Sequence, residues 1–221
     1  MARLVPPTNL RESVIAQLRS QIVSGAAAPG MIYSVPSLAN ELGVSTTPVR
    51  EALLELSRSG LVEPLRNRGF RVQAITLQDL ENHFDVRVML ESGALSTLAH
   101  KGLTDTAPLI ELADVVAQAV KDEDVGLYIE SDRCFHEALI ARAGNPLLTR
   151  MIMNLRADMR LYGIHSVEGK ERQRASVSEH YEMIELAATH QCEEITALIT
   201  RHIESWKSLF AASLQVAPGA D

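Results

Sequence analysis

The sequence predicts a mainly α-helical protein of two domains, and three observations lead to this fold class. The chain has 221 residues and is 46% hydrophobic, which is enough for two buried cores. Only 4% of its residues are aromatic, whereas Ala, Leu and Glu, which favour helices, are abundant. Apolar residues recur at helical spacing along most of the chain. We expect one domain over residues 1–75 and an all-α domain over 76–221.

Three helices are expected in the first domain. Residues 10–24 repeat apolar residues at i, i+4 spacing, which predicts an amphipathic helix. A short helix over 37–42, with Ser37 as its N-cap, precedes a longer helix over 45–59. Only Gly43-Val44-Ser45 separates these two helices, which is typical of a helix-turn-helix.

The pattern changes to short β-prone runs after the third helix. Residues 61–63 and 70–72 are short runs that favour β-strands, and the segment 64–69 joins them. Asn67 and Gly69 in that segment suit the positive φ angles of a tight hairpin. A hairpin directly after a helix-turn-helix is a wing, so the first domain is predicted to be a winged helix-turn-helix.

The second domain is predicted to be an antiparallel six-helix bundle. Short breaks at Gly, Asn, Pro and polar residues separate its helical segments. The expected helices cover residues 77–100, 107–120, 124–142, 146–163, 174–190 and 193–212. Short connections make consecutive helices antiparallel neighbours.

Charge is distributed unevenly between the two domains. Residues 1–75 hold eight Arg and five Glu, a net charge of +3, whereas residues 76–221 have a net charge of −10, which gives −7 for the whole chain. A small basic domain on an acidic one suits a protein that meets phosphates at one end, although chance variation explains it equally well.

Cys134 and Cys192 form no CxxC motif, and no segment resembles a membrane span or leader. We therefore expect a cytoplasmic protein that has no membrane partner.

The predicted helix-turn-helix points to double-stranded DNA as a partner. Short hydroxyl side chains and an arginine gather at the N-terminal end of its second helix, the end that enters a major groove. There, hydroxyls can contact phosphates and an arginine can bind guanine through two hydrogen bonds. Arginines at the wing tip can reach the backbone or the minor groove. The predicted DNA contacts are Ser45, Thr46, Thr47, Arg50, Arg66, Arg68 and Gly69.

Four side chains of the second domain are candidate metal ligands. Asp132 and His136 lie four residues apart on one predicted helix, so they share a face. His180 and His202 lie on the last two helices, which antiparallel packing could bring to the same point. Three imidazoles and a carboxylate suit Zn²⁺, Ni²⁺ or Mn²⁺ and leave positions open for water or a ligand. From spacing alone, a polar core network without metal explains them as well.

The first domain resembles the GntR family of regulators over residues 10–73. The resemblance is carried by the run LGVSTTPVREALLELSRSGLVEPLRNRGFRV, with its Pro-Val-Arg-Glu-Ala-Leu motif and the Gly-Leu-Val that enters the wing. Two positions depart from the family. Thr46 stands where relatives usually have Arg, and Val35-Pro36-Ser37 replaces an Arg or Glu pair. These departures put the operator sequence in doubt.

The second domain resembles the FCD ligand-binding domain of the FadR-type branch of that family, and its helix count resembles the VanR-like subgroup. The matching motifs are Asp132-Arg133-Cys134-Phe135-His136, Gly144-Asn145-Pro146, Ser178-Glu179-His180 and Arg201-His202. The resemblance implies that the four candidate ligands hold a divalent metal ion. It also implies that Arg87, with Arg156 as a second candidate, binds the carboxylate of a small organic acid effector. Alternatively, Arg87 simply pairs with Glu91 one turn further on.

These expectations combine into a homodimeric, ligand-responsive transcription regulator that binds a palindromic operator and has no catalytic residues. We expect a repressor, with an activator left open. A relative that lacks the metal and senses another metabolite, such as a fatty-acyl ligand, is one alternative. An interaction protein that no longer reads DNA is another. A helical metal-dependent hydrolase is a third, but no His-Asp pair and no HExxH motif supports it.

Overall fold

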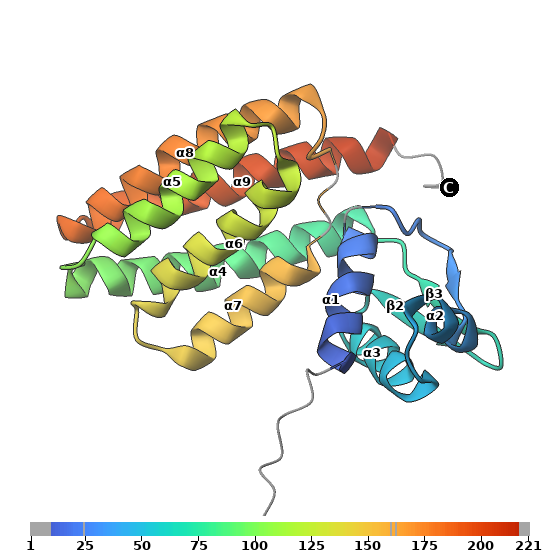
Figure 1. The fold of residues 1–221 in the computed structure, drawn as a ribbon. Coiled ribbons are helices and arrows are strands. Elements are labelled where there is room, and N and C mark those ends of the chain that lie inside the picture. Colours follow the sequence, from blue (N-terminus) through green and yellow to red (C-terminus); the bar gives the residue numbers. More distant parts are fainter. Residues whose placement is uncertain (1–9, 24, 160, 162, 217–221) are drawn as a thin grey trace, which may run out of the picture. The chain divides into compact units, whose positions relative to one another are not determined.

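A computed structural model of the chain describes residues 10–216 except residues 24, 160 and 162, so the outermost residues of both predicted domains lie outside the described part. The described residues divide into two compact units. The first reaches to Ile75 and takes in a short segment within 158–161, and the second holds the remainder. Helices make up most of both units (Figure 1), so the predicted mainly α-helical fold class is confirmed.

The first unit contains three helices and a small antiparallel sheet. Its elements are α1 (Leu10–Val23), β1 (Ile32–Tyr33), α2 (Val35–Leu42), α3 (Thr46–Arg58), β2 (Val62–Leu65) and β3 (Gly69–Val72). The strand order is β1-β3-β2, and β2 and β3 form the expected hairpin. The apolar stripe of α1, formed by Val14, Leu18 and Ile22, is buried in the shared core of this unit.

Two details of the first unit differ from the prediction. Helix α2 begins at Val35 with Ser34 as its N-cap, so Ser37 as the N-cap was wrong. Pro36 lies in the first turn of α2, where its missing N–H costs no intrahelical hydrogen bond. Strand β1 was not predicted, because two residues are too few to show an alternating pattern.

The second unit contains six helices among its described residues. They are α4 (Leu77–Lys101), α5 (Ala107–Lys121), α6 (Val125–Ala141), α7 (Pro146–Asp158), α8 (Val167–Ala188) and α9 (Cys192–Val216). Helix α4 packs along α9, and α5 packs against α6 and α8. A capping box of Thr76 and Asp79 begins α4, and the Asp124 carboxylate accepts the Leu127 N–H at the start of α6. Among the described residues, no helix is both long and apolar enough to cross a membrane.

Helices α7 and α8 differ most from the predicted boundaries. Helix α8 starts at Val167 rather than 174, because the Ser166 hydroxyl accepts the Gly169 N–H at 3.0 Å and caps it. The face that its first turns bury contains Gly169 and Gln173, so no apolar stripe marked it in the sequence. Helix α7 ends at Asp158 rather than 163, where the chain passes into the segment grouped with the first unit.

Candidate functional site

The N-terminal end of α3 presents a polar surface to solvent. Ser45 is the extended residue before the helix, and its hydroxyl makes no cap hydrogen bond to the helix. Ser45, Thr46, Thr47 and Arg50 are all exposed, whereas Val49 between them is fully buried. Helical periodicity therefore separates the face that anchors α3 from the face that is free to contact a partner.

The hairpin tip presents two arginines. Arg66 and Arg68 are exposed on either side of Asn67, whose φ of 60° makes the turn. Gly69 follows with a φ of 107°, and a Cβ at this position would lie 2.1 Å from the Tyr33 carbonyl oxygen. Close approach of β1 therefore accounts for Gly69. A DNA contact by this residue stays a prediction.

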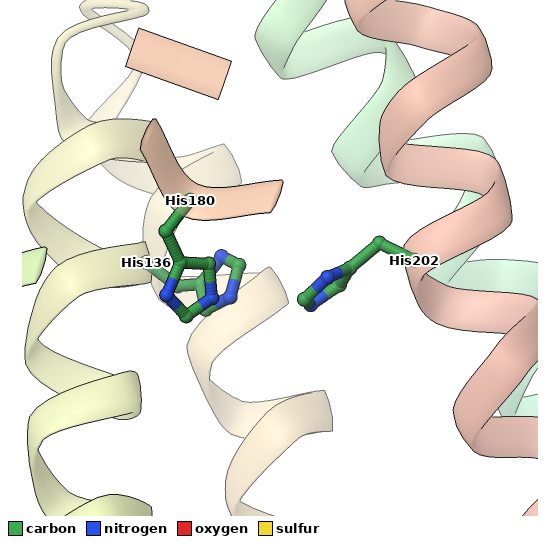
Figure 2. Close-up of side chains that lie close together, drawn as sticks. All are labelled: His136, His180 and His202. Atoms are coloured by element: carbon green, nitrogen blue, oxygen red, sulfur yellow. The ribbon is translucent and has the colours of Figure 1, made fainter. Parts of the chain in front are cut away.

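Three buried histidines from different helices of the second unit converge (Figure 2). His136 comes from α6, His180 from α8 and His202 from α9, and none is more than 2% exposed. Each offers one ring nitrogen within 4.8 Å of those of the other two. Phe135 stacks on the His180 ring with centroids 4.3 Å apart, which makes one side of the cluster apolar.

Asp132 lies beside this cluster, one turn before His136 on α6. Its Oδ1 is 3.3 Å from His180 Nε2 and 3.7 Å from His136 Nε2. Burial raises the pKa of the Asp132 carboxyl, but the His180 imidazole and the charge of Arg156 outweigh burial and lower this pKa to about 2. The structure thus brings the four predicted metal ligands together, with the carboxylate ionised.

The histidine chemistry fits a divalent metal ion. Both ring nitrogens of His136 and of His180 are buried without a hydrogen-bond partner among the described residues, which is costly for a polar group. Burial, followed by the charge of Arg156, lowers the pKa of His136 well below its usual value. Burial also lowers the pKa of His202 to about 4, against the opposing effect of Glu179. Neutral imidazoles are the form that binds metal, and coordination would satisfy the nitrogens that lack a partner.

The two predicted effector arginines share one buried carboxylate. Arg87 Nε donates to Glu91 Oε1 at 2.8 Å, and Arg156 Nη2 donates to Glu91 Oε2 at 2.6 Å. Arg156 Nη1 also lies 3.6 Å from Asp132 Oδ2, which links this group to the histidine cluster. The pairing of Arg87 with Glu91 is therefore present, and effector contact by either arginine stays a prediction.

Sequence reasoning missed a polar group on the other side of His202. Glu179 Oε2 lies 2.6 Å from His202 Nδ1, and the Arg172 guanidinium forms an ion pair with Glu179. Arg172 and Glu179 are seven residues apart, so they share a face of α8. That spacing was the available signal, but nothing in the sequence tied it to a histidine on α9.

Comparison with known proteins gives two family matches. Residues 10–72 match the gntR family of bacterial regulatory proteins, and residues 82–205 match the FCD domain. The chain is 28% identical to the uncharacterised HTH-type transcriptional regulator BphR of Paraburkholderia xenovorans strain LB400, over 91% of this chain and 86% of that protein. It is also 28% identical to the gluconate operon transcriptional repressor of Bacillus licheniformis, over 78% of this chain and 68% of that protein.

A solved structure agrees over nearly the whole chain. The structure of McbR/YncC from Escherichia coli superposes with a TM-score of 0.81 and 26% identity, covering 94% of this chain and 99% of that one. A sequence alignment with McbR of Escherichia coli K12 gives 35% identity over 62% of this chain and 63% of that protein. Because the FCD match alone spans more than half of the residues, the chain belongs to the GntR family of bacterial regulatory proteins, in the FadR-type branch that carries an FCD domain.

Proposed function

We propose that the protein is a homodimeric transcription repressor whose operator binding is modulated by a small carboxylate held at a divalent metal site. The observation that carries this proposal is the exposed, polar N-terminal end of α3 in a domain whose following hairpin has a basic tip. A helix end of this kind offers hydroxyls, an arginine and unpaired backbone N–H groups to the edge of a major groove. The DNA contacts we propose are Ser45, Thr46, Thr47, Arg50, Arg66, Arg68 and Gly69.

Selection from a random duplex pool tests the DNA-binding part. A dimer with two-fold symmetry presents two copies of α3, so the selected duplexes should contain inverted half-sites about one helical turn apart. Sedimentation of the free protein should give twice the 24.2 kDa mass of one chain. A protein that enriches no sequence and binds all duplexes equally would contradict the proposal.

The metal part of the proposal assigns Asp132, His136, His180 and His202 as ligands of Zn²⁺, Ni²⁺ or Mn²⁺. When bound, such an ion would act as a Lewis acid that holds a carboxylate at its open positions. Arg87 and Arg156 would bind a further carboxylate oxygen through their guanidinium groups. An effector that favours one arrangement of the bundle would shift the population that is competent to bind DNA.

Elemental analysis tests the metal part. Protein purified without chelator should contain about one divalent ion per chain, and His180→Ala should lose it, because this substitution removes one of four ligands. His190→Ala, which replaces a histidine outside the cluster, is the matched control and should retain the ion. A metal-free wild-type preparation that takes up no added Zn²⁺, Ni²⁺ or Mn²⁺ would contradict the assignment in favour of a polar core network.

A further inference from the structure

We propose that Glu179 is a positioning residue that orients His202 for metal binding and that Arg172 in turn fixes Glu179. The inference rests on the proposed metal site, and it concerns residues outside the four ligands. It is carried by a continuous line of contacts from α8 to α9, in which each group has a defined partner.

The contact between Glu179 and His202 joins two helices inside the second unit. Glu179 Oε2 lies 2.6 Å from His202 Nδ1, and the two side chains are 14% and 2% exposed. Arg172 Nη1 donates to Glu179 Oε1 at 3.1 Å, and Arg172 Nη2 donates to Oε2. A guanidinium that binds both oxygens of a carboxylate restricts its rotation, so Glu179 is held in the orientation that meets the ring.

These contacts favour the His202 tautomer that carries its proton on Nδ1. Two groups compete for His202 Nδ1. Arg172 Nη2 lies 3.1 Å away and could only donate to an unprotonated Nδ1, because a guanidinium cannot accept a hydrogen bond. Because the Glu179 carboxylate is closer to Nδ1 and can only accept, we assign the proton to Nδ1 and the hydrogen bond to Glu179. The Nε2 lone pair is then left to bind a metal. A carboxylate behind a ligating histidine fixes the ring and increases its basicity.

His202 differs in this respect from the other two histidines. The ring nitrogens of His136 and His180 make no hydrogen bond among the described residues, and the carboxylate beside them belongs to Asp132, itself a proposed ligand, whereas His202 Nδ1 has Glu179. Glu179 therefore gives the cluster one ring that is oriented before any ion arrives. Because one ligand is already ordered, metal binding loses less side-chain conformational entropy.

Zinc affinity of the full-length protein measures this role. Glu179→Gln keeps the size of the side chain but removes its charge, and Glu179→Ala removes the acceptor as well. Competition with a chromophoric chelator should show Zn²⁺ binding about 10- to 100-fold weaker in both variants. Glu182→Gln, which replaces an exposed glutamate on the same helix, is the control and should bind as the wild type does. Circular dichroism of the metal-free variants checks that they fold.

A spectroscopic readout separates positioning from a general loss of structure. In the metal-free wild type, ¹⁵N NMR should report His202 with its proton on Nδ1, and Glu179→Ala should shift this ring toward the Nε2–H tautomer.

The possible outcomes test the positioning role of Glu179 separately from the proposed metal site. A wild type that binds no Zn²⁺ would overturn the metal site and the positioning role together. A wild type that binds Zn²⁺ with the same affinity as folded Glu179→Gln and Glu179→Ala would overturn the positioning role alone. An unchanged His202 tautomer in Glu179→Ala would likewise contradict it.

Discussion

Arg50 is the exposed arginine in the first turns of α3, and its contribution can be measured directly. Arg50→Ala should weaken binding to the selected duplex. A lost base contact costs about 1–3 kcal/mol, whereas a lost phosphate contact reduces the salt slope of log affinity by about 1. Fluorescence anisotropy titrations at several salt concentrations separate these cases. Arg58→Ala is the control, because that side chain is 76% exposed at the opposite end of the same helix. Equal affinities of Arg50→Ala and the wild type would remove Arg50 from the interface.

Glu91 makes the stability of the second unit depend on pH. Burial raises the pKa of its carboxyl, but the charges of Arg156 and Arg87 outweigh burial and lower it below 4.5. Because the folded pKa is the lower one, Glu91 stabilises the fold above about pH 4.5, and this stabilisation is lost as the pH falls through the folded value.

Glu91→Gln should therefore destabilise the protein at pH 7 by about 3–5 kcal/mol, since two buried guanidinium groups lose the negative charge of the carboxylate that they share. The deficit should shrink as the pH is lowered below 4.5. Urea unfolding at pH 7 and at pH 4, with a chelator present, measures both effects. The control is Glu111→Gln, an exposed position on α5. A deficit of the same size at both pH values would contradict the assigned role.

At the scale of the elements, the wing depends on a close contact between strands. Gly69→Ala should destabilise the first unit, because the new Cβ would lie 2.1 Å from the Tyr33 carbonyl oxygen and force β1 away from β3. Gly60→Ala is a matched control, because Gly60 also has a positive φ, 75°, but no atom lies within 4 Å of a Cβ there.

The control should lose only the cost of a left-handed residue, about 1–2 kcal/mol, and Gly69→Ala should lose more. Thermal unfolding monitored by circular dichroism gives the comparison. If both variants lost the same stability, the contact with β1 would not constrain the wing.

Sequence pattern predicted most helices because their buried faces are apolar, as in α1 with Val14, Leu18 and Ile22. It failed where that condition does not hold. The first turns of α8 bury Gly169 and Gln173, so the pattern carried no signal there, and only the Ser166 cap marks the true start. Strand β1 exists because it pairs with β3, which is a contact between residues distant in sequence.

At the scale of the whole molecule, the candidate site shows a similar division. Helical spacing alone placed Asp132 and His136 on one face of α6. Joining them to His180 and His202 needed an assumption about helix packing, which the resemblance to a family supported, because the packing of α6, α8 and α9 is not encoded in local spacing. Glu179 was missed for the same reason: its partner His202 lies 23 residues away on another helix.

The proposed coupling between the two units makes a quantitative prediction for the whole protein. A thermal-shift screen of small carboxylates and sugar acids on Zn²⁺-loaded protein should find a compound that raises the unfolding midpoint, because binding to the native state stabilises it. If that compound releases the protein from DNA, its presence should weaken duplex affinity by about 5- to 150-fold.

Linkage requires the reverse effect to be equal. Saturating duplex should weaken binding of the compound by the same factor, because the coupling free energy belongs to both sites. Isothermal titration of the compound into free and DNA-bound protein measures how much the duplex weakens binding of the compound. Anisotropy of the labelled duplex measures how much the compound weakens binding of the duplex. His180→Ala is the control: it should keep duplex affinity but lose its response to the compound. A compound that binds tightly and leaves duplex affinity unchanged would show that it is not an effector, and the absence of coupling for every compound that binds would contradict ligand control of DNA binding.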